Sequence, residues 1–246
     1  MCQLCEVENT LSVHAKSKRN FLKSMSGLGL AGLAPNYALG VVSSTPRKPE
    51  SVFTPNAALE RLMAGNERYT RGTSHPFEFI HDQQALAGEQ HPFATIVTCA
   101  DARVMPELCF DEQRAGLFMT RVAGNYASAE ILPSLEYAAL ILKVPLIMVL
   151  GHQDCGAVKA AMESVEKHAH FPAHIQAMAT AIAPAVRATQ KQTGNRYDNV
   201  IRENVILNVK RLKHTAPAIS ELVTKKKVKV VGGVYSLRTG RVELVT

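Results

Sequence analysis

The sequence predicts an α/β fold: a mostly parallel central sheet of four strands, plus a short antiparallel edge strand, flanked by helices. Short apolar runs of strand length alternate along the chain with longer segments that have helical spacing of apolar residues, which is the pattern of βαβ units. The most apolar run, residues 145–151, is typical of a central strand that is buried on both faces. Only the turn at Thr239-Gly240 separates the last two runs, so we expect this final pair to be antiparallel.

Capping and turn residues place the individual elements. Thr54 can cap a helix and Pro55 suits the first helical position, so the first helix begins there and continues to about residue 70. Pro92 and the polar residues after position 99 bound the first strand, and Gly124-Asn125 ends the second. The two periodicities predict strands at 93–99, 117–122, 145–151, 228–235 and 241–245, and further helices at 134–142, 156–168, 172–190 and 197–213.

Composition limits the classes of function. The 246 residues are 46% hydrophobic and 20% charged, which suits a folded domain and excludes a disordered polypeptide. No apolar run reaches the roughly 20 residues of a membrane span, so we expect no stable membrane span. The formal charge of +7 is compatible with nucleic-acid binding. However, the basic residues Lys225, Lys226, Lys227 and Lys229 have no interleaved aromatics, so we expect a solvated face and no nucleic-acid partner.

The N-terminal segment has the order of an export signal. A basic cluster precedes a weakly apolar run, and small residues follow: the cluster is Lys16, Lys18, Arg19 and Lys23, the run is 25–34, and Ala38 and Gly40 come next. The segment resembles a twin-arginine signal in which Lys18 replaces the first arginine. We therefore expect residues 1–40 to direct export to the periplasm, residues 41–54 to be a linker, and 55–246 to form one domain. The alternative is a cytoplasmic protein with a disordered extension.

Metal-ligating residues end two of the predicted strands. Cys99 follows the first strand, and His152 and Cys155 follow the central one. Ligands of open parallel sheets bind beyond the carboxyl ends of the strands, so these side chains converge if the two strands are neighbours. Two thiolates and an imidazole form a tetrahedral zinc set with one position open, which is the pattern of a catalytic site. Cys109 has no such context and is predicted to be a core residue.

The other conspicuous residues are a charged pair and two cysteines at the N-terminus. Asp101 and Arg103 lie in the loop after Cys99. Asp101 could take the fourth zinc position and close the site, or Arg103 could hold its carboxylate and leave that position to water. Cys2 and Cys5 form an isolated CxxC pair, for which we expect no role in the mature domain.

These residues resemble the β-class carbonic anhydrase family. Its hallmark motifs stand here as Cys99-Ala-Asp101-Ala-Arg103 and, further along the chain, Gly151-His152-Gln-Asp-Cys155-Gly156. The resemblance covers roughly residues 55–245. It continues through Arg121-Val-Ala-Gly-Asn125, Ser134-Leu-Glu-Tyr137-Ala, Glu203-Asn-Val205 and Gly233-Val-Tyr235…Thr239-Gly240.

The resemblance implies a function and a set of site residues. The reaction would be reversible hydration of CO2 to bicarbonate and a proton by a zinc-bound hydroxide. One Zn²⁺ per chain would be held by Cys99, His152 and Cys155, while Asp101 and Arg103 control the fourth position. In the plant-like branch, the positions matched by Gln90, Phe118 and Tyr137 line the substrate pocket, with Gln90 supplied by the facing subunit. Members form homodimers or homotetramers in which the N-terminal helices embrace the partner.

One departure from the family and two rival functions complete the prediction. Some members have a regulatory bicarbonate pocket containing a Trp three residues before the first zinc cysteine. Here that position is Ile96 and the chain has no Trp, which argues against this form of regulation. Hydrolysis of CS2 or COS on the same fold is one alternative function. A non-enzymatic zinc-binding protein is the other, although mere binding has no use for the Asp101–Arg103 pair.

Overall fold

The computed structural model describes residues 54–77, 83–84, 86–214 and 216–246. The proposed export signal, the Cys2–Cys5 pair and nearly all of the linker lie outside these residues. No helix of the described chain is both long and apolar enough to cross a membrane.

A five-stranded sheet forms the centre of the described domain, in the spatial order β2-β1-β3-β4-β5. The first four strands are parallel, and β5 pairs antiparallel with β4. The strands are β1 (Ala94–Thr98), β2 (Leu117–Arg121), β3 (Leu146–His152), β4 (Lys229–Tyr235) and β5 (Val242–Leu244). The predicted fold class is therefore confirmed, including the antiparallel edge.

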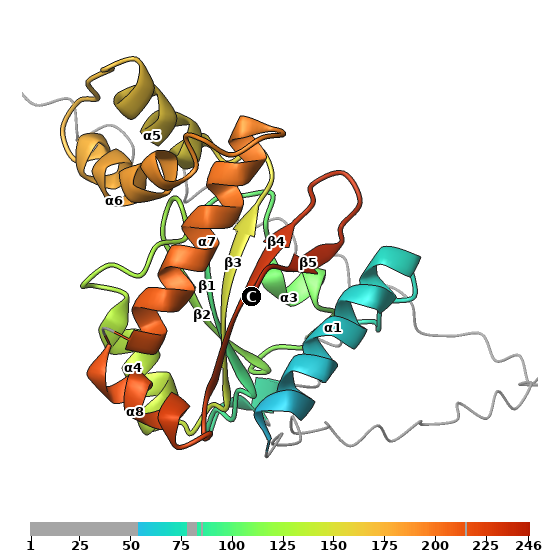
Figure 1. Ribbon diagram of the computed structural model, residues 1–246. Coiled ribbons are helices and arrows are strands. Elements are labelled where there is room, and N and C mark those ends of the chain that lie inside the picture. Colours follow the sequence, from blue (N-terminus) through green and yellow to red (C-terminus); the bar gives the residue numbers. More distant parts are fainter. Residues whose placement is uncertain (1–53, 78–82, 85, 215) are drawn as a thin grey trace, which may run out of the picture. The chain divides into compact units, whose positions relative to one another are not determined.

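Helices cover both faces of the sheet (Figure 1). They are α1 (Pro55–Arg71), α3 (Pro106–Cys109), α4 (Leu132–Leu140), α5 (Gly156–Glu166), α6 (Ile175–Ala188), α7 (Arg196–His214) and α8 (Pro217–Thr224). Strand β3 is buried along its whole length, and its alternate side chains enter two different cores. Leu146, Met148 and Leu150 pack with α1 and α3, whereas Ile147 and Val149 pack with α4, α7 and α8. Two-sided burial explains why this run is continuously apolar rather than alternating.

The start of α1 follows the predicted chemistry. Thr54 has an extended backbone, and its hydroxyl accepts a hydrogen bond from the amide of Ala57 at 3.1 Å, while Pro55 occupies the first turn. The helix ends at Arg71, where Gly72 adopts a left-handed conformation. Two salt bridges to buried carboxylates anchor the helix, Arg61 with Glu112 and Arg68 with Asp111.

Two helices were not predicted. Both α3 and α8 begin at a proline and are short, four and eight residues respectively. Cys109, predicted to be a core residue, is indeed buried at the end of α3, where desolvation raises the pKa of its thiol.

Candidate metal centre

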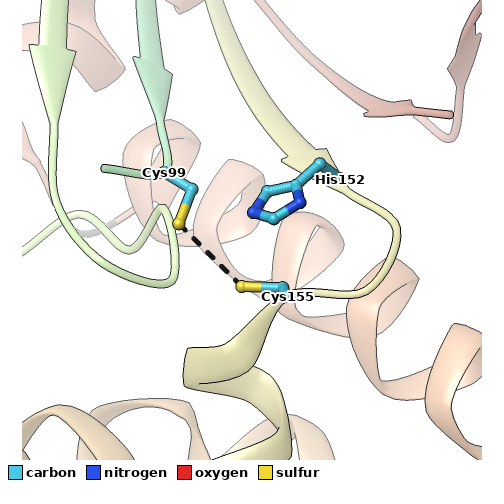
Figure 2. Close-up of side chains that lie close together, drawn as sticks. All are labelled: Cys99, His152 and Cys155. Atoms are coloured by element: carbon cyan, nitrogen blue, oxygen red, sulfur yellow. Dashed lines mark hydrogen bonds between the residues drawn. The ribbon is translucent and has the colours of Figure 1, made fainter. Parts of the chain in front are cut away.

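The two predicted motifs meet at the carboxyl ends of neighbouring strands. Cys99 follows β1, His152 is the last residue of β3, and Cys155 caps the N-terminus of α5. Their ligand atoms all lie within 4.8 Å of one another, and all three residues are buried. Figure 2 shows both sulfur atoms and the imidazole around one space, with the sulfurs 3.9 Å apart.

The imidazole of His152 is oriented by the main chain. Its Nδ1 lies 2.7 Å from the carbonyl oxygen of Gln153. A carbonyl can only accept, so Nδ1 must carry the proton and the lone pair must be on Nε2. Nε2 is buried and has no hydrogen-bond partner in the structure. An unsatisfied buried acceptor is costly, and a cation beside the two sulfurs would satisfy it.

The two thiols are electrostatically coupled. The Cys155 thiol can donate to Cys99, whose sulfur also accepts the amide hydrogen of Gly124 at 3.3 Å. These bonds lower the pKa of Cys99 to about 4. The hydrogen bond that Cys155 donates to the Cys99 thiolate raises the pKa of Cys155, and burial raises it further. The pair therefore keeps one thiolate readily, and the second ionisation needs a cation to offset its charge.

The structure shows one of the two predicted arrangements of Asp101. Arg103 binds its carboxylate with two side-chain bonds, Nε to Oδ1 at 2.9 Å and Nη2 to Oδ2 at 2.7 Å. The Arg103 amide adds a third bond to Oδ1. These bonds hold the pKa of Asp101 well below its usual range, so it stays ionised at physiological pH. Oδ2 lies 3.9 Å from Nε2 of His152, so the carboxylate that Arg103 holds borders the three ligands.

Two side chains secure the loop and helix that carry the ligands. Arg121, the last residue of β2, donates to the carbonyls of Cys99, Asp101 and Val104, at 3.1, 2.7 and 2.9 Å. The Tyr197 hydroxyl, at the start of α7, donates to the carbonyl of Cys155 at 2.6 Å. Tyr197 was not predicted, because it lies 42 residues beyond Cys155 and outside both motifs.

The donor set fits zinc. Two Zn–S bonds of about 2.3 Å at a tetrahedral angle place the sulfurs about 3.8 Å apart, close to the 3.9 Å observed. The set is soft, with two thiols and one imidazole whose free nitrogen faces them. With Asp101 turned toward Arg103, the protein supplies three ligands and leaves the fourth position open, as in catalytic zinc sites.

Comparisons with known proteins agree with this site. The family model described as carbonic anhydrase matches residues 94–242. Carbonic anhydrase 2 of Mycobacterium tuberculosis is 36% identical over 77% of this chain and 92% of its own length. The carbonic anhydrase of Mycolicibacterium smegmatis is 34% identical over 77% and 93%. The chain belongs to the β-carbonic anhydrase family.

Solved β-carbonic anhydrases share the fold. The enzyme CcaA superposes with a TM-score of 0.61 at 24% identity, covering 76% of this chain and 86% of that one. A tetrameric β-carbonic anhydrase from Sordaria macrospora also gives 0.61, at 21% identity over 77% and 94%. At these identities the likeness supports the fold alone, and the family assignment rests on the sequence matches.

The three predicted substrate-pocket residues do not join the metal ligands within one chain. Phe118 and Tyr137 form an aromatic pair on β2 and α4, with ring centroids 6.3 Å apart. Phe118 lies opposite Thr95, four residues before Cys99, so it is about 13 Å from that strand end. Tyr137 is 45% exposed, and Gln90 is exposed before β1. Their role in a β-carbonic anhydrase pocket stays a prediction that requires a second copy of the chain.

Proposed function

We propose that this chain is a zinc enzyme that catalyses the reversible hydration of CO2 to bicarbonate. The observation that carries the proposal is the buried Cys99–His152–Cys155 set, with a free Nε2 and an open fourth position beside an ionised Asp101. Membership of the carbonic anhydrase family supports the same reaction. Zinc at this position would lower the pKa of a coordinated water and so supply hydroxide at moderate pH.

The protein side chains would orient and desolvate the reactants. Asp101 is acceptor-only when ionised, and Arg103 occupies one side of its carboxylate. The carboxylate can therefore accept a hydrogen bond from the attacking oxygen and direct a lone pair of that oxygen toward CO2. Arg103 also donates to the carbonyl of Asp154 at 3.2 Å, which connects the loop after β1 to the turn after β3.

The charge of the ligand set predicts the pH dependence. Two thiolates and a neutral imidazole reduce the formal charge of a zinc site to zero, whereas three imidazoles would leave +2. The bound water should consequently be less acidic than in a three-histidine site. Asp101 does not titrate near neutrality, so we expect the rate of CO2 hydration to rise between pH 6 and 9. A constant rate over that range would contradict the charge argument.

We further propose that the functional unit is a homodimer or homotetramer. Partly exposed apolar side chains lie on or beside α3 and α4, namely Met105, Leu108, Tyr137, Leu140 and Ile141, and Tyr137 pairs with Phe118 of the edge strand β2. Solvent-exposed apolar side chains of this size favour association. A second copy could then supply Gln90, Phe118 and Tyr137 as polar and apolar walls for CO2. Sedimentation velocity should give a particle larger than one chain.

The decisive experiment is stopped-flow CO2 hydration with zinc measured in the same sample. We expect one zinc per chain and activity that Asp101→Asn lowers by about 10²-fold or more, with zinc retained. Glu221→Gln removes an exposed carboxylate on α8, away from the metal ligands, and should leave the rate unchanged. One zinc per chain without CO2 hydration would reject the proposed reaction.

We also propose that residues 1–40 direct export to the periplasm. The support is the order of basic, apolar and small residues in that segment. Cell fractionation of the intact chain and of a chain lacking residues 1–40 tests this proposal. Export should be lost with the deletion and improved by Lys18→Arg. Equal distribution of both chains would reject it.

A further inference from the structure

A second pocket lies at the amino end of the sheet, opposite to the metal centre. Its volume is about 430 Å³, within the range of small-molecule sites. It is formed where α1 begins, where β4 begins and where α8 ends, near the blue end of α1 in Figure 1. Strand β4 runs from Lys229 at this pocket to Tyr235, which pairs with His152. The six intervening steps separate the two sites by about 20 Å.

Three lysines line this pocket, and the only carboxylate among its described lining residues is the terminal one of Thr246. They are Lys213, Lys226 and Lys229. Lys229 donates to the side-chain oxygen of Asn56 at 3.0 Å. Within the described part of the chain, the ammonium groups of Lys213 and Lys226 form neither a hydrogen bond nor an ion pair. Neither of them pairs with the terminal carboxylate of Thr246. The neighbouring Lys225 differs, since it pairs with Glu221 outside the pocket.

This arrangement is electrostatically unfavourable when the pocket is empty. Lys213 and Lys229 are half-buried, so their charges lose part of their hydration, and neither forms an ion pair within the described part of the chain. The dipole of the 17-residue helix α1 adds positive potential at its amino end, and no acidic residue in the first turn offsets it. A bound anion would offset both contributions.

The rest of the lining indicates what the anion carries. Four valines form the wall of the pocket, Val223, Val228, Val230 and Val231. Val228, Val230 and Val231 are already buried in the core, but Val223 and Pro55 are only partly buried, so an alkyl group would cover apolar surface that an inorganic anion would leave exposed. Among the residues that the structure describes, the lining contains no aromatic side chain on which a nucleobase could stack.

We propose that this pocket binds a small amphiphilic anion, a carboxylate or phosphate monoester attached to a short apolar body. The anionic group lies among the three lysines, and the apolar body contacts the valines. Binding of this anion would explain the cluster of basic residues near the C-terminus, which neither the metal centre nor the sheet requires.

Calorimetric titration of the purified full-length, zinc-loaded protein tests the site with four probes. These are octanoate, octyl phosphate, inorganic phosphate and 1-octanol. We expect octanoate and octyl phosphate to bind. Inorganic phosphate, which has no alkyl chain, and 1-octanol, which has no charge, should bind at least tenfold more weakly. Lys213→Gln with Lys226→Gln should weaken both amphiphiles at least tenfold. Val223→Thr keeps the side-chain shape and should weaken octanoate several-fold.

Matched controls separate this site from general charge effects. Lys143→Gln with Lys191→Gln removes two exposed charges elsewhere and should leave the affinities unchanged. The proposal is overturned if neither amphiphile binds, or if both lysine pairs weaken binding equally. Binding to phosphatidylglycerol vesicles without binding of either free amphiphile would overturn it in favour of a membrane surface.

Discussion

Gly151 lies where helix α7 packs on the sheet, immediately before the metal-ligating His152. A Cβ atom added at this position would approach Cγ2 of Val205 to 2.7 Å. Carbon atoms in contact are normally 3.5–4.0 Å apart, so α7 or β3 must move by about 1 Å. Because Val205 is fully buried, overpacking should lower the free energy of unfolding by about 1–3 kcal/mol in Gly151→Ala. The same displacement should weaken zinc binding through His152.

A double-mutant cycle tests this packing explanation. Val205→Ala alone removes two buried carbon groups and should cost about 2 kcal/mol. It also removes the clash, so Gly151→Ala with Val205→Ala should be at least about 1 kcal/mol more stable than additivity predicts. Urea unfolding at a fixed zinc excess gives all four values, and Gly88→Ala, which meets no atom within 4 Å, is the control. Effects that add within about 0.5 kcal/mol would refute the packing explanation.

Two further predictions concern side chains that hold the elements around the site. Arg61→Met should lower the free energy of unfolding by about 2–4 kcal/mol because it leaves the buried Glu112 unpaired, whereas Arg71→Met in the same helix breaks an exposed pair and should change it by less than about 0.5 kcal/mol. Equal effects in urea unfolding would contradict this reasoning. Tyr197→Phe removes the donor to the Cys155 carbonyl and should accelerate zinc loss to a chelator several-fold, at a cost of about 1 kcal/mol in stability. Unchanged zinc release would show that the helix start needs no such support.

Periodicity predicted the sheet because each strand keeps one environment along its length. The run at 145–151 is apolar since both its faces are covered. The observed strand, Leu146–His152, differs from this run by one residue at each end. Helices α3 and α8 escaped prediction because four and eight residues are too few for a helical repeat to be visible. Their prolines indicated a boundary without indicating what followed it.

The metal ligands were predictable because their spacing is local and their chemistry is specific. The choice between Asp101 on zinc and Asp101 on Arg103 was not, since it depends on bonds from three donor groups at one carboxylate. Tyr197 could not be found either, because only the packing of α7 brings its hydroxyl to Cys155. Long-range contacts of this kind have no periodic or spacing signal in a single sequence.

The three predicted zinc ligands share a mode of support. Each is positioned through the main chain: Gly124 donates its amide to the Cys99 sulfur, Gln153 accepts from His152, and Tyr197 holds the carbonyl of Cys155. Main-chain groups at strand ends cannot rotate away as side chains can, so the ligand atoms are held close together before metal arrives. Preorganisation of this kind lowers the entropic cost that zinc binding must overcome.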